Sequence, residues 1–279
     1  MITSENRPIR IAILDLNEGR PNQSMRCIRQ ILHEWAEDNS TVIQQTEFDV
    51  RVKNELPDTS FDIYISSGGP GDPLSTRFDD WDINWNRWLN EMERWNNNPS
   101  NARKKHIFFI CHSFQLASRY FNIGVLRKRR STAFGVFPVH MLEDGKDETV
   151  FDGLRDPFYA VDSRDYQLVQ PNLSLLNEMG AQILCIEKDR PHVPYERAVM
   201  GIRFNEYMIG TQFHPEADPV GMSRHLQTEE KRKIVIESYG EEKLNNMLEH
   251  LSDPDKIMWT YSRILFNFLD SAIGVREYA

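Results

Sequence analysis

The sequence lacks the features that mark secreted, membrane-spanning or disulfide-stabilised proteins. Its 279 residues include three cysteines, Cys27, Cys111 and Cys185, an odd and dispersed set that fits a reducing compartment. No run approaches the ~18 consecutive apolar residues of a transmembrane helix. The N-terminal segment lacks the basic and then apolar pattern of a signal peptide. We therefore expect a cytoplasmic protein that does not interact with a membrane.

Positive charge is also in short supply. The formal net charge is −9, which argues against a nucleic-acid-binding surface. The exception is the run Arg127-Lys-Arg-Arg130, which we interpret as a solvated loop or helix end. The histidines and cysteines lack the close spacing of metal ligands, so no metal is predicted, and no motif calls for a cofactor.

The first third of the chain alternates strand and helix patterns. Apolar runs predict strands at 9–16, 48–52 and 61–67, while apolar residues recur at helical spacing over 24–35. The third strand runs directly into Gly68-Gly-Pro-Gly71. This order is typical of an α/β fold with an open, mostly parallel, doubly wound sheet and helices on both faces, in which ligands bind at the carboxyl ends of the strands.

The rest of the chain is assigned to the same domain, spanning 1–279. A tryptophan-rich helix is predicted over 79–98, with its rings in core or interface packing rather than ligand stacking. A strand is predicted over 134–141, and a hairpin with a two-residue turn at Asn205-Glu206. Residues 222–279 are predicted to form a helical C-terminal extension.

Cys111 lies where a buried strand is predicted to enter a helix. The apolar run at 107–110 ends at this residue, and a helical pattern follows. A tight strand-to-helix turn would present the sulfur at the positive end of the helix, where a thiolate is favoured. The alternative is an inert core residue, because free cysteine is often buried.

Two further motifs supply groups that a thiol nucleophile needs. His214 and Glu216 would share one face of a regular strand, so the carboxylate could orient the imidazole as a base. Pro215 between them removes a backbone donor and breaks the ladder. Gly68 and Gly69 allow backbone N–H groups to approach a developing oxyanion.

Together these motifs resemble the class I glutamine amidotransferase superfamily. The resemblance covers roughly residues 9 to 217, and it is specific in combination rather than in any single motif. Its marks stand in order as Ser66-Ser-Gly-Gly-Pro-Gly-Asp-Pro73, Phe109-Ile-Cys-His-Ser-Phe-Gln115 and Gly210-Thr-Gln-Phe-His-Pro-Glu216. The resemblance implies a flavodoxin-like fold and an enzyme with a Cys-His-Glu triad.

The resemblance also assigns roles at matching positions. Cys111 would be the nucleophile, His214 the general base and acid, and Glu216 the residue that orients it. The backbone N–H groups of Gly69 and His112 would form the oxyanion hole. The predicted substrate-binding residues are Gly68, Gln115, Ser163 and Arg164.

The sequence departs from the amidotransferase pattern at the cysteine. The family usually has glycine two residues before and after it, where this chain has Phe109 and Ser113. Other stretches, including 7–16, 134–138 and Ser163-Arg164, resemble a sister branch, the homoserine O-acyltransferases. Where that branch has a lysine after its first strand, this chain has Glu18-Gly19-Arg20.

Three functions therefore remain open. The favoured one is cleavage of the amide of glutamine, or of a related γ-glutamyl or amide substrate, through a thioester. The second is transfer of an acyl group from coenzyme A to the hydroxyl of homoserine. The third is an inactive binding or regulatory relative. The expected partner is a small-molecule substrate; a synthetase subunit that takes up the ammonia, and a second copy of the chain, are left open.

Overall fold

The computed structural model describes residues 7–20, 22–192, 194–253 and 256–274. These residues form a mixed α/β fold around a nine-stranded sheet with strand order β2-β1-β3-β4-β9-β8-β6-β5-β7. The strands are β1 (Ile9–Asp15), β2 (Ile43–Asp49), β3 (Ile63–Ser66), β4 (His106–Ile110), β5 (Val125–Met141), β6 (Phe158–Val169), β7 (Gln182–Glu187), β8 (Val199–Asn205) and β9 (Met208–Thr211).

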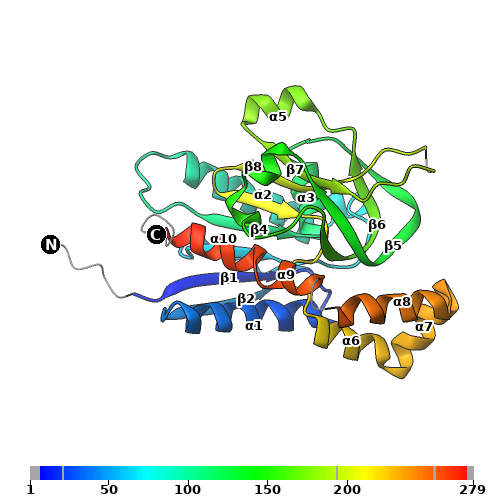
Figure 1. Ribbon diagram of the computed structural model, residues 1–279. Helices are drawn as coiled ribbons and strands as arrows, with labels where there is room; N and C mark the ends of the chain where they lie inside the picture. Colours follow the sequence, from blue (N-terminus) through cyan, green and yellow to red (C-terminus); the bar gives the residue numbers. More distant parts are fainter. Residues whose placement is uncertain (1–6, 21, 193, 254–255, 275–279) are drawn as a thin grey trace.

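Helices cover both faces of this sheet (Figure 1). The α-helices are α1 (Gln23–Asp38), α2 (Asp80–Asn97), α3 (His112–Tyr120), α4 (Glu143–Lys146), α5 (Leu173–Met179), α6 (Pro219–Gln227), α7 (Glu229–Tyr239), α8 (Glu241–Ser252), α9 (Ile257–Tyr261) and α10 (Ile264–Ile273). Two short 3₁₀ helices are η1 (Ser75–Phe78) and η2 (Thr149–Phe151). The predicted fold class is confirmed.

One half of the sheet is parallel. Strand β1 pairs with β2 and β3, β3 pairs with β4, and β4 pairs with β9, each in parallel. Side chains alternate between two cores: Ile11 and Ile13 belong to one, Ala12 and Leu14 to the other. Burial on both faces explains the nearly continuous apolar run of β1. The carboxyl ends of these strands meet at one edge.

Each face of the parallel half has its own helices. Helices α1 and α10 contribute to the core that contains Ile11, and α2 and α3 contribute to the core that contains Ala12. Trp81, Trp85 and Trp88 of α2 are all buried in the second core. Packing is therefore the role of the tryptophan-rich helix.

The other half of the sheet is antiparallel, and here several predicted boundaries were wrong. Strand β5 begins at Val125, so the run Arg127 to Arg130 is strand rather than a loop or helix end. The hairpin turn lies at 206–207, one residue later than predicted, since Asn205 pairs with Met208. Strand β2 spans Ile43–Asp49, whereas the strand was predicted over 48–52, so the two ranges overlap only at 48–49.

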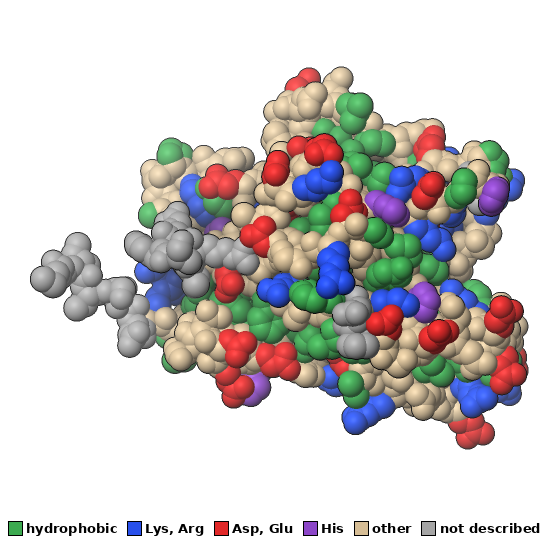
Figure 2. Space-filling model, in the orientation of Figure 1, with side chains coloured by type: hydrophobic (Ala, Val, Ile, Leu, Met, Phe, Trp, Pro, Cys, Tyr) green, Lys and Arg blue, Asp and Glu red, His purple; other side chains and the backbone are tan. Residues whose placement is uncertain are grey.

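The C-terminal helices pack in two places. Helices α6, α7 and α8 pack together beyond one end of α1, with α6 against it (Figure 1), and acidic and basic side chains are interspersed over their exposed surface (Figure 2). They form a third apolar cluster with Val136 of β5 and Val161 of β6. Helix α10 joins the α1 core instead. The division into one domain with a helical extension stays a prediction. No helix among the described residues is long and apolar enough to cross a membrane.

The two-core packing makes a testable prediction at Trp85, which is fully buried against Trp88 and Phe109. Trp85→Ala should lower the free energy of unfolding by about 3–5 kcal/mol, because it leaves a cavity in a close-packed core. Phe78→Ala is the control: its side chain is 82% exposed, and a change within about 0.5 kcal/mol is expected. Urea denaturation measures both, and equal losses would contradict the assignment of the core.

Candidate active site

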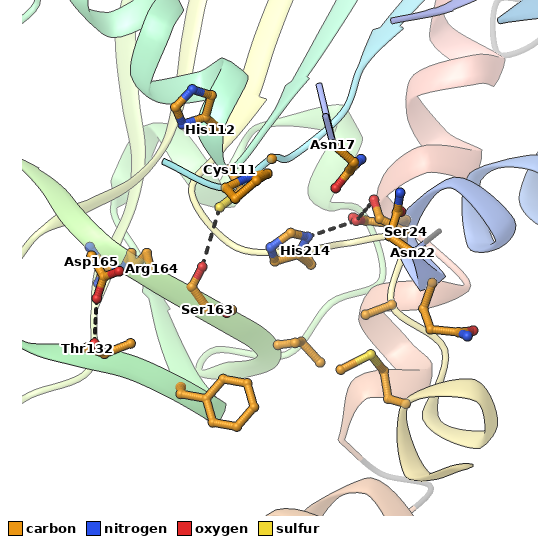
Figure 3. Close-up of a pocket in the computed structure, with 18 of the residues that line it drawn as sticks. Asn17, Asn22, Ser24, Cys111, His112, Thr132, Ser163, Arg164, Asp165 and His214 are labelled. Atoms are coloured by element: carbon orange, nitrogen blue, oxygen red, sulfur yellow. Dashed lines mark hydrogen bonds and ion pairs between the residues drawn. The ribbon is translucent and has the colours of Figure 1, made fainter. Parts of the chain in front are cut away.

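A cavity of about 530 Å³ lies at the carboxyl ends of the parallel strands. Its walls come from the segments after β1, β3, β4 and β9, from α1, from β5 and β6, and from α6 and α8 (Figure 3). Of the nine predicted site residues, eight line it: Gly69, Cys111, His112, Gln115, Ser163, Arg164, His214 and Glu216. Residues far apart in the sequence therefore meet where the fold predicts a ligand site.

Cys111 occupies the tight turn between β4 and α3. Its φ is +49° and its ψ is −98°, a left-handed conformation that a residue with a side chain rarely adopts. Such strain costs on the order of 1–3 kcal/mol and persists only where the surrounding structure enforces it. The turn places Cys111 as the N-cap of α3, at the positive end of the helix.

Phe109 and Ser113, which replace the glycines usual beside the cysteine, are both accommodated. The Ser113 hydroxyl accepts a hydrogen bond from the Ile110 N–H at 2.8 Å and lies 2.6 Å from the Ser66 carbonyl, to which it donates. Phe109 is fully buried and faces Gly210 of β9, where an added Cβ would lie 2.9 Å from the Phe109 Cβ. The cysteine turn therefore forms with both substitutions in place.

His214 and Glu216 interact directly, although they do not lie on a regular strand as predicted. They follow β9, and the backbone of His214 makes an isolated bridge to Val161. The His214 Nδ1 lies 2.8 Å from the Glu216 Oε1. The Ser24 hydroxyl of α1 donates to the same oxygen at 2.5 Å. Glu216 is 1% exposed, so its carboxylate is held in one orientation.

The charge of His214 is controlled by its two neighbours. Burial lowers the pKa of His214, but the negative charge of Glu216, followed by the charge and hydrogen bond of Cys111, more than offsets it. The pKa of His214 therefore lies well above its ordinary value. An imidazole that couples to both a carboxylate and a thiol is poised to carry a proton between the thiol and a substrate.

The Cys111 sulfur is held by further polar contacts. Gln212 Nε2 donates to it at 3.7 Å, and the sulfur lies 3.7 Å from the Ser163 carbonyl (Figure 3). Gln115 Nε2 in turn donates to the Gln212 Oε1 at 3.0 Å. Gln115 therefore supports the amide that contacts the sulfur.

Gly68 and Gly69 permit two close approaches. A Cβ on Gly68 would lie 2.8 Å from the His214 Cε1 and 3.4 Å from the Cys111 Cβ, so Gly68 leaves room for the imidazole rather than lining the cavity. A Cβ on Gly69 would clash with the Leu16 carbonyl.

Burial, with the positive charges of Arg51 and Arg119, lowers the pKa of His112 to about 3 and keeps its ring neutral.

A comparison with protein families identifies the family of this chain. The family described as "Glutamine amidotransferase class-I" matches residues 26–230. This chain belongs to that family. Among curated proteins, none matches the sequence.

Solved structures show the same fold at low sequence identity. A glutamine amidotransferase from Thermotoga maritima is 14% identical, with a TM-score of 0.67 over 96% of this chain and 99% of its own. One from Methylobacillus flagellatus is 12% identical, with a TM-score of 0.59 and coverage of 95% and 94%. The glutaminase domain of Trypanosoma brucei CTPS, solved with acivicin, is 14% identical, with a TM-score of 0.56 and coverage of 95% and 94%.

Sequence reasoning missed several residues of the site in this class I amidotransferase chain. Ser24 contacts Glu216 across 192 positions, and no local signal marks it. Gln212 stands two residues before His214. Because side chains two residues apart on a strand share a face, this spacing could have indicated that Gln212 belongs to the site. Met222, Leu226 and Met247 bring apolar surface from α6 and α8.

Arg164, like Gln115, is a predicted substrate-binding residue whose side chain already has protein partners. It reaches the cavity wall, but its guanidinium Nε lies 3.0 Å from both Asp162 oxygens, and its Nη2 lies 3.3 Å from Glu187.

Among the described residues, no group of three or more His, Cys, Asp or Glu side chains is arranged to hold a metal ion.

The coupling of His214 to Glu216 predicts a pKa change. Glu216→Gln removes the negative charge that raises the pKa of His214, so that pKa should fall; NMR titration of the imidazole measures it. Because the folded pKa exceeds the unfolded value of about 6.5, protonation of His214 stabilises the fold below that pH. This contribution is lost as the pH rises through the folded pKa, so the variant should lose most stability at low pH. Glu37→Gln, at an exposed site on α1, should leave the His214 pKa unchanged; equal shifts in both variants would contradict the pairing.

Proposed function

We propose that this chain is a cysteine-dependent amidotransferase-type enzyme that cleaves the side-chain amide of glutamine or of a related γ-glutamyl compound. One observation carries the proposal: His214 lies between a buried carboxylate, 2.8 Å from its Nδ1, and the thiol at the strained turn. Cys111 is the nucleophile, His214 the base and acid, and Glu216 the residue that orients the imidazole.

The first step forms a thioester. His214 accepts the proton of the Cys111 thiol as the sulfur reacts, and its raised pKa favours holding that proton on the imidazole. The sulfur attacks the amide carbon, and the carbonyl oxygen becomes an oxyanion. His214 then gives its proton to the departing nitrogen, the C–N bond breaks, and ammonia leaves behind a glutamyl thioester on Cys111.

The oxyanion needs donors that are in place before the reaction. We assign this role to the backbone N–H groups of Gly69, after β3, and His112, at the start of α3, because both residues line the cavity beside the sulfur. The neutral side chain of His112 is buried and takes no part in proton transfer. In the second step His214 removes a proton from water, which cleaves the thioester and releases glutamate.

The fate of the ammonia is a separate part of the proposal. The Trypanosoma brucei neighbour is a glutaminase domain of CTPS. By analogy, we propose that a synthetase subunit accepts ammonia from this chain. Met222 and Leu226 of α6 and Met247 of α8 line one wall of the cavity, the side from which we propose that an acceptor or partner approaches. The release of ammonia should be compared between glutamine and γ-glutamyl amides as substrates, with and without an added synthetase.

The reaction class can be tested with two parallel assays on the purified protein. With glutamine, ammonia and glutamate should appear in equal amounts, because one amide bond is cleaved in each turnover. With acyl-coenzyme A and homoserine, free coenzyme A should stay at the level of the enzyme-free control. Release of coenzyme A that depends on homoserine would replace the proposal with the acyltransferase reaction. Neither product, together with no labelling of Cys111 by a glutamine-like electrophile, would indicate an inactive relative.

The role of Cys111 predicts a large and selective loss. Cys111→Ala should reduce ammonia release from glutamine by at least about a thousandfold, because no thioester can form. Cys185→Ala is the matched control: this cysteine is fully buried, outside the cavity, and its loss should spare kcat. Circular dichroism confirms that both variants fold. A Cys111→Ala protein with ordinary turnover would refute the assignment.

A further inference from the structure

A second cavity adjoins the first and is lined by residues of β5, β6, β7 and α8. Its volume is about 280 Å³. Thr132 of β5 lines both cavities, so the two share a wall. The second cavity contains none of the triad residues, and six of its fourteen lining residues are charged: Arg129, Asp162, Glu187, Lys188, Arg190 and Lys243.

Three arginines in or beside this cavity form ion pairs with two buried carboxylates, Asp162 and Glu187. Arg129 and Arg190 each lie 2.9 Å from Glu187, one on each of its oxygens. Arg164 contacts Asp162 at 3.0 Å and Glu187 at 3.3 Å. Even so, the Arg190 Nε is buried without a hydrogen-bond partner in the described part of the chain. The arginine and carboxylate set therefore already carries one surplus positive charge.

Two lysines add to this surplus. The ammonium groups of Lys188 and Lys243 lie 4.3 and 4.6 Å from the centre of the same Phe137 ring. Within residues 7–20, 22–192, 194–253 and 256–274, no carboxylate comes within 4.0 Å of either ammonium. Gly135 makes room for one of them, since an added Cβ would lie 2.9 Å from the Lys243 Nζ.

The lysines are held at an electrostatic cost. Burial, and then the positive charge of Lys188, lowers the pKa of Lys243. Burial lowers the pKa of Lys188 too; the negative charge of Glu187 partly offsets this effect, and the positive charges of Arg190 and Arg129 add to it. Like charges in a partly desolvated cavity repel one another unless an anion is supplied. Five positive groups against two carboxylates leave an excess of three, enough for a dianion.

We propose that this second cavity is a binding site for a phosphoryl group, either inorganic phosphate or a phosphomonoester. Two ammonium groups and an unpaired guanidinium N–H suit a compact tetrahedral dianion. The hydroxyl group of Ser131, at the cavity wall, is a further donor, whereas the Thr132 hydroxyl already donates to Asp165. The family match ends at residue 230, so Lys243 lies outside it and the site is completed by the C-terminal helices.

Occupancy of this site would act on the Cys111 cavity through α8. Lys243 lines the second cavity, called the phosphate cavity below. Met247, one helical turn later, lines the first cavity, which contains Cys111. A phosphoryl group bound by Lys243 would hold α8 against β5 and so hold Met247 in the wall of the other cavity. This regulatory consequence rests on the proposed function, whereas phosphate binding does not.

Phosphate binding is tested without any turnover assay. Calorimetric titration of the full chain with inorganic phosphate should give saturable binding, and phosphate should raise the Tm more than sodium chloride at matched ionic strength. Glycerol 2-phosphate is the second probe. Tighter binding of this ester than of phosphate would identify an organic phosphate as the source, and the reverse order would identify free phosphate. An equal rise in Tm with chloride would overturn the proposal.

A charge-removing pair of substitutions assigns the site. Lys188→Met with Lys243→Met keeps the apolar stems on Phe137 and should weaken phosphate binding by at least about tenfold. Without phosphate, the double variant should have an unchanged or higher Tm, because repelling charges are gone. Lys233→Met, whose side chain is 72% exposed on α7, should bind like the parent. Should the double variant not fold, Lys243→Gln alone serves. Unchanged phosphate affinity in the folded variant refutes the site.

Discussion

The strained turn at Cys111 is the constraint on which the site depends. A residue with a side chain at φ +49° needs surroundings that offset its cost. The Ser113 hydroxyl ties the turn to the ends of β3 and β4, and Gly210 leaves space for Phe109 beneath it. The two positions that differ from the family pattern are thus part of the packing that holds the turn, which places the sulfur at the edge of the sheet.

The second constraint is electrostatic and joins distant parts of the chain. Glu216 is buried, accepts a hydrogen bond from Ser24 of α1 and pairs with His214. Its charge, together with Cys111, outweighs the burial that would otherwise leave the imidazole neutral. A fixed carboxylate in a dry site thus orients the ring and adjusts its charge, the combination that a thiol nucleophile requires. The C-terminal helices then close the cavity with apolar side chains and connect it to the phosphate cavity through α8.

Much of the parallel half could be predicted because each element has a local signature. Strand β1 shows its burial on both faces as a nearly continuous apolar run, and α1 shows its buried face as an apolar repeat. The antiparallel half was harder. Strand β5 contains the charged run Arg127 to Arg130 near its start, where Arg127 and Lys128 pair with β6 in the ladder and Arg129 forms a buried ion pair with Glu187. The turn at 206–207 differs from the predicted one by a residue, since register depends on the partner strand.

For the site, the sequence alone was enough to propose Cys111, His214 and Glu216 as candidate catalytic residues, because they stand in short motifs whose spacing reflects local geometry; their catalytic roles stay a prediction. It did not determine their supports. Ser24 meets Glu216, Gln212 meets the sulfur, and Arg164 turns its charge to Asp162 and Glu187 only because the sheet brings separate strands and helices together. The lysine pair at Phe137 is likewise a product of tertiary structure: Lys188 follows β7 and Lys243 lies on α8, and packing alone sets them at one ring.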